Sequence, residues 1–320
     1  MKKSLSLIVA ALLCGSVAGY AQESYDAQRI AEIFKQLNGD PKNPKQKVNH
    51  AKGFCAGGSF TPDKNITSII DVPMLGEGKI PVEFRYSLGG AVMSDKSKPR
   101  GLALRIQGQN ETWTMVMLGT EINFARTPEE FGQFFEMRLP VNGKVDQEKI
   151  QRLMKEVDSY RKFVEYTDQM GITPSVANTA YYSIHTFYFK DKKSGKMLPA
   201  RWKFVPVEGV KYLSDQELKT KGDAFLEEDL KQRVAKKPIA YEMYLVYANK
   251  GDATDDTTAL WKGKHKEVFV GTLQAEQYSG LECNAEVYFP SEIPQGVGAP
   301  KDPLFDIRNE AYGITFGFRQ

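Results

Sequence analysis

Hydrophobic and polar residues along the chain follow two different periods, which predict helices and strands. Apolar residues recur at the spacing of one helix face within residues 24–38, whereas apolar and polar residues alternate within residues 81–87, as in a half-buried strand. Between them, residues 41–65 are rich in Pro, Lys, Asn and Gly, and we predict a loop or extended arm there. The strand pattern recurs later, over residues 100–106, 112–118, 181–190, 200–206, 239–248, 267–274 and 282–289.

Helix-start signals place further helices among these strands. The run Thr127-Pro128-Glu129-Glu130 is typical of a helix N-terminus, and Ser214 to Glu217 forms a capping box that opens a helix to about residue 236. We also predict a charged helix over residues 145–166 and a last helix after Asp302-Pro303. Strands and helices do not alternate one for one, which disfavours a parallel βαβ sheet. The pattern therefore predicts an α+β fold, in which an antiparallel sheet or closed barrel carries inserted helices.

Residues 1–21 have the pattern of a secretory signal peptide. Lys2-Lys3 forms a positive start and Leu5 to Leu13 an apolar run, while small residues at Gly19 and Ala21 mark a cleavage site. The apolar run is shorter than the roughly 18 residues that a membrane span needs, and no later segment is apolar enough. We expect residues 22–320 to form a single exported domain. The short lysine start is typical of bacteria, so we expect it in the periplasm.

Composition excludes several classes of protein. The 320 residues are 41% hydrophobic and 26% charged with a net charge of only +3, so the chain is neither disordered nor an electrostatic nucleic-acid binder. Three cysteines and three histidines are too few for a multi-cysteine zinc site. Cys55 and Cys283 lie in the exported part. The sequence does not fix the distance between them, so pairing stays open, and we favour two separately buried thiols.

The three histidines are the first candidates for chemistry, because the usual catalytic signature motifs do not occur. His265 lies among lysines, which predicts a solvated charged face. His185 alternates with aromatic residues on a predicted strand, which favours a structural role. His50 is different, because it lies in the segment Lys47 to Gly53 and small residues follow it. Glycines allow a close backbone approach to a ligand, so His50 is the strongest functional candidate of the three.

The segment HAKG, followed by AGGSF, resembles the distal-histidine segment of the haem catalases. Further matches follow in the family's order along nearly the whole chain, and the chain as a whole resembles the short, exported catalase-related peroxidases. The strand Val82 to Ser87 resembles the family's VRFS, and the other matching segments are Pro99 to Ala103, Trp113 to Arg126, His185 to Phe187, the Arg-x-x-x-Tyr motif from Arg308 to Tyr312, and Arg319.

The resemblance implies an eight-stranded antiparallel β-barrel with inserted and C-terminal helices, which binds haem b. Tyr312 would ligate the haem iron as a phenolate, which Arg308, one helical turn earlier, would stabilise. His50 would move a proton within the bound peroxide, and Ser87 would hold its other ring nitrogen. A phenyl ring would stack on the haem and cations would bind its propionates: Phe124, Lys47, Arg85 and Arg319.

Two positions depart from the family pattern. Lys47 stands where the family has an arginine, so it lacks the bidentate fork of a guanidinium. The family's distal asparagine, which helps to position hydrogen peroxide, falls at Gly119 in a gapless alignment, and Asn123 replaces it only if the loop shifts. Loss of this amide would weaken oxidation of a second hydrogen peroxide molecule and enlarge the pocket for organic hydroperoxides. We therefore favour a peroxidase over a true catalase.

The sequence thus predicts a haem peroxidase that reduces hydrogen peroxide or organic hydroperoxides with a small organic reductant. Four alternatives stay open: a true catalase, a non-catalytic haem carrier, a fatty-acid hydroperoxide isomerase on the same barrel, and a barrel that binds no haem. We expect a monomer or homodimer, without a nucleic-acid or membrane partner.

Overall fold

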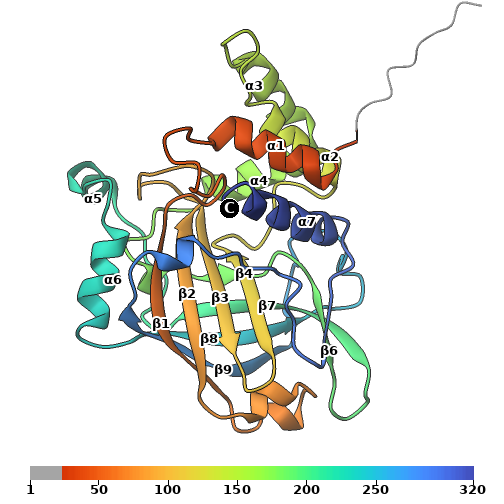
Figure 1. The fold of residues 1–320 in the computed structure, drawn as a ribbon. Helices are drawn as coiled ribbons and strands as arrows, with labels where there is room; N and C mark the ends of the chain where they lie inside the picture. The colour runs from red at the N-terminus through yellow and green to blue at the C-terminus, as the bar shows by residue number, and fades with distance from the viewer. Residues whose placement is uncertain (1–23) are drawn as a thin grey trace, which may run out of the picture.

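Eight antiparallel strands close into a barrel in the computed structural model, which describes residues 24–320. Each strand pairs with the next around the ring, and the pairing of the strands labelled β7 and β8 closes it (Figure 1). In order around the barrel these strands are β7 (Met197–Pro206), β5 (Tyr181–Tyr182), β4 (Thr112–Leu118), β3 (Arg100–Gln107), β2 (Ile80–Leu88), β1 (Gly53–Pro62), β9 (Glu267–Tyr278) and β8 (Ile239–Tyr247). Two short strands, β6 (Phe187–Lys190) and β10 (Val297–Gly298), extend the sheet beyond β7.

The barrel is filled by apolar side chains from the inward-facing positions of its strands. In β8 every second residue from Ile239 to Tyr247 is buried. Trp113 and Trp202 meet edge to face inside the barrel, and Phe187 stacks on Trp202. Burial of each such ring contributes about 2–3 kcal/mol of hydrophobic free energy. The barrel interior is therefore a packed core, and the space for a ligand lies at one end of the barrel.

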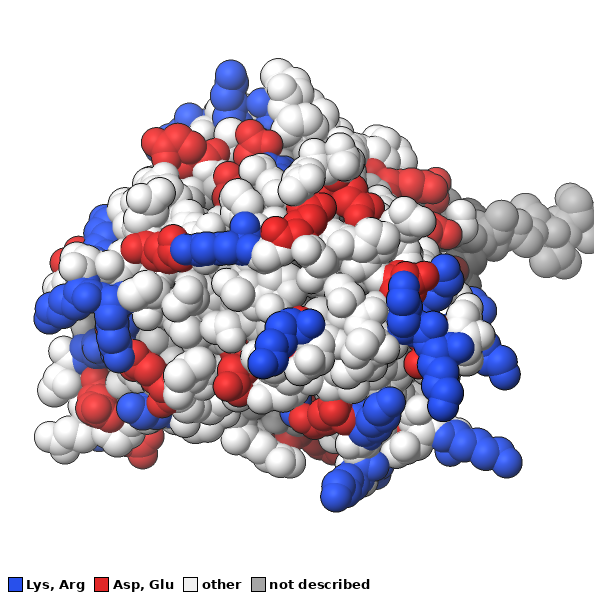
Figure 2. All heavy atoms as spheres, turned by 90° about the horizontal axis from the view of Figure 1, so that it is seen from below, with Lys and Arg blue, Asp and Glu red and all other residues white. Residues whose placement is uncertain are grey.

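Most of the helices gather at that end of the barrel, above the strand ends, and two others lie along its side (Figure 1). The helices at the end are α1 (Ala27–Asn38), α2 (Pro128–Glu136), α3 (Gln147–Glu156), α4 (Asp158–Asp168) and α7 (Leu304–Gly317), and those at the side are α5 (Asp215–Thr220) and α6 (Leu226–Val234). Short 3-10 helices are η1 (Ile66–Ser68), η2 (Pro73–Gly76), η3 (Val176–Asn178) and η4 (Glu282–Asn284). None of the helices within residues 24–320 has the length and apolar character of a membrane span. At the opposite end of the barrel, acidic and basic side chains are interspersed over a largely neutral surface (Figure 2).

The predicted α+β barrel with inserted helices is confirmed, as are its helix-start signals. The side chain of Thr127 accepts the backbone N–H of Glu130 at the start of α2. Ser214 and Glu217 form the predicted capping box at the start of α5. The helix predicted over residues 24–38 is α1, which begins after the cap at Asp26.

Two segment predictions are wrong. Residues 41–65 contain β1, and residues 282–289 form no strand but the short helix η4 and irregular backbone. Glycine composition suggested a loop in the first segment, yet Gly58 is needed in a strand because a Cβ atom there would lie 1.9 Å from the carbonyl oxygen of Gln274. A register shift between β1 and β9 occurs beside it, at Gly57 and Gly58.

Three predicted elements are each divided in two. The helix expected to run to about residue 236 ends at Thr220, and α6 starts anew because the Asp95 carboxylate accepts the backbone N–H groups of Phe225 and Leu226. The strand expected over residues 181–190 is interrupted from Ser183 onward and resumes as β6. The predicted charged helix is α3 and α4, which are separated at Val157 by extended backbone.

Cys55 and Cys283 form a disulfide, with a Cα–Cα distance of 5.9 Å, so the prediction of two separate thiols is wrong. The bond joins β1 to η4, the two elements whose secondary structure was mispredicted. With a loop at one cysteine and a strand at the other, the sequence offered no reason to place them together. The predicted signal peptide, residues 1–21, lies outside the described residues.

Candidate functional site

A cavity of about 300 Å³ lies between the helices and one end of the barrel. Its wall includes all eight residues to which the family resemblance gave a role at the haem: Lys47, His50, Arg85, Ser87, Phe124, Arg308, Tyr312 and Arg319. They come from the loop before β1, from β2, from the loop after β4, and from α7 and the chain end beyond it. The neighbouring strands β2, β3 and β4 line the cavity, and Ser87 of β2 lies opposite Gly101 of β3 in their pairing register.

His50 is held in an unusual backbone conformation, with φ at 51°, which non-glycine residues rarely adopt. The Asn49 side-chain oxygen stabilises this turn by accepting the backbone N–H groups of His50 and Gly90, both at 3.0 Å. On the imidazole, Nδ1 lies 3.0 Å from the Ser87 hydroxyl. The turn and the hydroxyl together fix the ring at the cavity wall and leave Nε2 for a ligand. The sequence pointed to Ser87, whereas Asn49 was not predicted.

The electrostatics of the cavity keep the His50 imidazole neutral. Burial, together with the positive charges of Arg85, Arg308 and Lys47, lowers its pKa to about 3. A neutral imidazole at pH 7 is able to accept a proton from a bound ligand and return it. The position and the charge state of His50 are therefore those of a proton carrier.

On α7, Tyr312 lines the cavity next to a buried chain of polar groups. Arg308 Nη2 lies 3.5 Å from the Tyr312 hydroxyl, and Nη1 of the same guanidinium lies 2.7 Å from His185 Nε2. Guanidinium groups only donate, so His185 Nε2 is the acceptor and its Nδ1–H donates to Asp302, at 2.8 Å. The side chains of His185 and Asp302 are 4% and 1% exposed, so this chain is closed to solvent.

Neither His185 nor Asp302 was predicted from the sequence to take part in this chain. His185 was expected to be structural because it alternates with Phe187 along a strand, and Asp302 was interpreted as the start of a helix. His185 instead lies where the strand is interrupted, because the Ser183 hydroxyl donates to the His185 carbonyl and accepts the backbone N–H of Trp202. His265, expected on a solvated face, has a side chain that is 5% exposed and lies 2.8 Å from Asp252.

Three cationic side chains meet at one end of the cavity without a carboxylate partner. Arg85 and Arg319 are 4% and 7% exposed, and Lys47 is partly buried beside them. Burial lowers the pKa of Lys47 to about 6, helped by the charges of Arg85 and Arg319. Burial likewise lowers the pKa of Arg85 to about 10. No carboxylate of residues 24–320 lies within ion-pair distance of these three groups; their hydrogen bonds go to neutral oxygens. This end of the cavity is therefore suited to a ligand with more than one negative charge.

Aromatic rings form a second wall of the cavity. Phe124 stacks on Phe134 with a centroid distance of 4.0 Å, and on Phe131 at 5.2 Å. Phe135 and Phe163 pack on Phe124 edge to face and also line the cavity. A flat apolar ligand would therefore find an aromatic surface here.

Asn123 is a second asparagine of the cavity wall, besides Asn49. It is 2% exposed and lines the cavity, and its backbone N–H donates to the carbonyl of Thr257. Gly119, where the gapless alignment places the family's distal asparagine, does not line the cavity. The condition stated for Asn123 is thus met, because the loop after β4 brings Asn123 to the cavity, and the placement of the family's asparagine at Gly119 by the gapless alignment is wrong.

Comparison with known proteins agrees with this site. The family model for catalase matches residues 35–319. The chain belongs to the catalase family. Members of the family are oxidoreductases that act on peroxide, and they bind haem. The resemblance inferred from the sequence motifs is therefore confirmed.

The relatives include short and long members of the catalase family. A catalase-related peroxidase of Synechococcus elongatus is 29% identical over 99% of this chain and 95% of its own length. Another, from Mycolicibacterium paratuberculosis, is 23% identical over 86% of this chain and 90% of its own length. The catalase of Schizosaccharomyces pombe is 25% identical over 91% of this chain, which spans only 60% of that protein. Catalase A from Saccharomyces cerevisiae has the same fold, with a TM-score of 0.77 at 19% identity, over 86% of this chain and 61% of that chain.

The donor groups around the cavity fit the haem that catalases bind. Haem is a flat apolar macrocycle with two carboxylates and an iron that needs an axial ligand. The aromatic wall around Phe124, the three cations without an ion-pair partner among the described residues and the Tyr312 phenol beside Arg308 each match one of these parts. The fit rests on the chemistry of side chains that the fold already brings together.

Proposed function

We propose that this protein is a haem b-dependent peroxidase, which reduces hydrogen peroxide or organic hydroperoxides with electrons from a small organic donor. One observation carries the proposal: a single cavity joins the His50–Ser87 pair from the strand ends and the Arg308–Tyr312 pair from α7. A non-catalytic haem carrier would need the second pair but not the first. The catalase-related peroxidases among the relatives match over almost their whole length, which supports the same assignment.

Tyr312 would hold the iron of the haem through its phenol oxygen. Haem, when bound, supplies the iron at which the peroxide bond is broken and through which electrons pass to the peroxide. Tyr312 would coordinate as a phenolate, and the Arg308 guanidinium at 3.5 Å would stabilise its negative charge. His185 and Asp302 would keep Arg308 in that position, because they accept and relay its hydrogen bond inside the protein.

His50 would perform the proton transfer that peroxide cleavage requires. Its neutral imidazole would take a proton from one oxygen of the bound peroxide and give it to the other oxygen, which leaves as water or as an alcohol. Ser87 holds the ring through Nδ1, so Nε2 is the nitrogen directed to the peroxide. Proton transfer by a positioned side chain contributes about 100- to 10,000-fold to a rate.

A second candidate function is the disproportionation of hydrogen peroxide, and Asn123 is the observation that favours it. A buried amide at the cavity wall is able to orient a second hydrogen peroxide by hydrogen bonding. Simultaneous assays of oxygen release and of donor oxidation distinguish the two activities.

We further propose that the protein is exported to the periplasm. The N-terminal pattern of residues 1–21 supports export, and the Cys55–Cys283 disulfide is a bond that persists in oxidising compartments.

Rapid-mixing absorption spectroscopy of the haem-loaded protein, without residues 1–21, tests the function. One equivalent of peroxide should change the haem spectrum quickly, and a phenolic donor should restore it. His50→Ala should slow the first step about 100-fold or more without loss of haem, whereas Tyr312→Phe should change the spectrum of the resting protein. A resting spectrum that peroxide only bleaches slowly would favour the carrier.

A further inference from the structure

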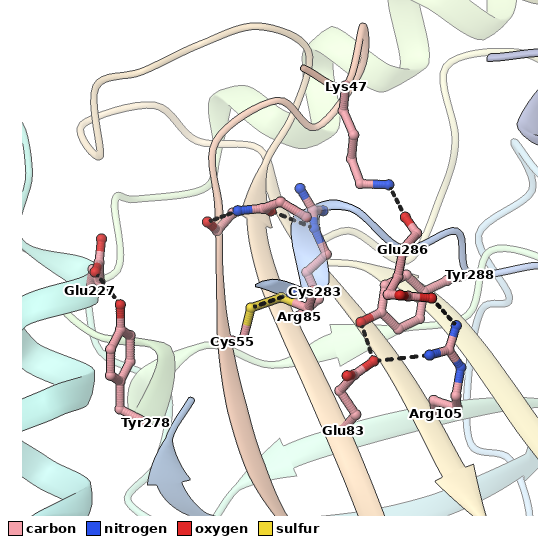
Figure 3. Close-up of a disulfide and its surroundings, with 12 residues drawn as sticks. Lys47, Cys55, Glu83, Arg85, Arg105, Glu227, Tyr278, Cys283, Glu286 and Tyr288 are labelled. Carbon is pink, nitrogen blue, oxygen red and sulfur yellow. Dashed lines mark hydrogen bonds and ion pairs between the residues drawn. A yellow bond between two sulfur atoms is a disulfide. The ribbon is translucent and has the colours of Figure 1, made fainter. Parts of the chain in front are cut away.

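The three cations of the cavity form hydrogen bonds to one short segment, residues 284–286, which directly follows Cys283 of the disulfide. Figure 3 shows Lys47 reaching Glu286 near the disulfide. Arg85 Nε donates to the Asn284 side-chain oxygen at 2.9 Å, and Arg319 Nη1 donates to the Asn284 carbonyl at 3.0 Å. Lys47 Nζ donates to the carbonyl of Glu286. Each acceptor is a neutral oxygen, so the segment orients the cations without forming an ion pair with them, while the Glu286 carboxylate pairs with Arg105.

Asn284 makes the most connections in this segment. Besides the two arginine contacts, its Nδ2 donates to the Gly53 carbonyl at 2.8 Å, which joins the segment to β1. Gly53 leaves space for this arrangement, because a Cβ atom there would lie 2.5 Å from Arg85 Nη2 and 2.6 Å from Asn284 Oδ1. The absence of a side chain at Gly53 thus allows Asn284 to contact two arginines and a strand.

The disulfide anchors the residue immediately before Asn284. Cys283 is bonded to Cys55 in β1, and its backbone N–H donates to the Cys55 sulfur at 3.1 Å. Both cysteines are at most 3% exposed and pack with Ala103 and Tyr288, which line the cavity. Apart from η4, residues 279–300 run mainly as turns and irregular backbone, so the covalent bond supplies the rigidity that a strand would otherwise give.

We propose that Asn284, anchored by the Cys55–Cys283 disulfide, is the positioning residue that presets Arg85 and Arg319 for the two carboxylates of the cofactor. The inference rests on the proposed haem function. A neutral amide suits the task, because an aspartate would keep the Arg85 hydrogen bond but cancel the charge that attracts a carboxylate. The nearby carboxylates are engaged elsewhere: Glu83 with Arg105 and Tyr288, and Glu286 with Arg105 (Figure 3).

The test compares binding of haemin with binding of haemin dimethyl ester, in which both carboxylates are blocked. Absorption titrations would use the mature protein and four variants: Asn284→Ala, Asn284→Asp, the double Cys55→Ser/Cys283→Ser variant and Asn249→Ala. Asn249 is the matched control, because its side chain donates to the Lys264 carbonyl in an exposed loop away from the cavity.

Asn284→Ala and Asn284→Asp should each raise the dissociation constant for haemin about 10- to 100-fold and leave that for the diester unchanged. The double cysteine variant should lower the preference for haemin over the diester about tenfold, because residues 284–286 are no longer anchored in the position that orients the cations. Asn249→Ala should change neither constant.

Two results would overturn the proposal. One is an equal loss of affinity for haemin and its diester in Asn284→Ala, which is what general unfolding of the segment would give. The other is an unchanged preference for haemin in both Asn284 variants. A wild-type protein that binds neither porphyrin would instead refute the proposed function itself, on which the inference depends.

Discussion

Gly101 leaves the space in which the His50 ring lies. A Cβ atom built on Gly101 would lie 2.8 Å from His50 Nδ1 and 2.6 Å from the Ser87 hydroxyl. Such distances are shorter than van der Waals contact, so a side chain at position 101 would displace the ring or the hydroxyl. The glycine of the Pro-Arg-Gly segment is therefore explained by the space that the His50 and Ser87 side chains need, not by its own backbone conformation.

We expect Gly101→Ala to impair the peroxide reaction while the protein still binds haem. A misplaced proton carrier slows the step by about 10- to 100-fold, because the rate depends on the position of Nε2 to within about 1 Å. Stopped-flow measurement of the spectral change with peroxide checks this. Gly222→Ala is the control, since no heavy atom lies within 4 Å of a Cβ atom there. An unchanged rate in Gly101→Ala would show that the His50–Ser87 pair tolerates displacement.

The barrel was predictable because its strands carry a local signal. In β2 and β8 the alternation of apolar and polar residues is set by one buried face, so a single sequence is enough to recognise it. In β1 this signal is weak because Gly57 and Gly58 are required by close contacts with β9, which no local pattern reveals. The disulfide escaped prediction for the same reason, since it joins residues 228 positions apart.

The candidate site was predictable only as far as its motifs extend. The motifs around His50 and Tyr312 led directly to side chains that line the cavity. Asn284, Asn49 and Asp302 act through hydrogen bonds to distant residues, whereas an asparagine or aspartate in a loop commonly serves only to form a turn or to cap a helix. Their part in the site follows from tertiary contacts.

His185→Leu should destabilise the protein and also disturb Tyr312, the proposed iron ligand. The substitution removes the partner of Arg308 Nη1 and of the buried Asp302 carboxylate, at a cost of about 3 kcal/mol in the free energy of unfolding. Because Arg308 is then free to move from Tyr312, the absorption bands of the haem-loaded protein should shift. His265→Leu breaks a pair of the same length with Asp252 away from the cavity. It should lower the stability in urea unfolding without a spectral shift, and a shift in both variants would contradict the assignment.

Asn123→Ala should separate the two peroxide activities. Loss of the amide removes a hydrogen-bond partner for hydrogen peroxide, so oxygen release should fall about tenfold or more. Donor oxidation with a bulky organic hydroperoxide should stay the same or rise, because the pocket becomes larger. An oxygen electrode and a dye-oxidation assay measure the two rates, and Asn249→Ala serves as an exposed control. A parallel fall of both rates would show that Asn123 is structural.

Lys47 makes haem affinity depend on pH in a way that arginine would not. Its pKa is about 6 in the free protein, and a bound carboxylate raises it, so binding takes up a proton above pH 6. Below about pH 6, Lys47 contributes fully to the affinity for haemin. Above this pH, its contribution to the affinity falls by up to tenfold per pH unit, until the pH reaches the raised pKa of Lys47 in the complex. Lys47→Arg keeps its charge throughout. The ratio of haemin affinities, variant over wild type, should therefore increase from pH 6 to pH 8 in absorption titrations. Lys45→Arg, an exposed change in the same loop, should give a ratio independent of pH. A flat ratio for Lys47→Arg as well would mean that Lys47 remains charged in the free cavity.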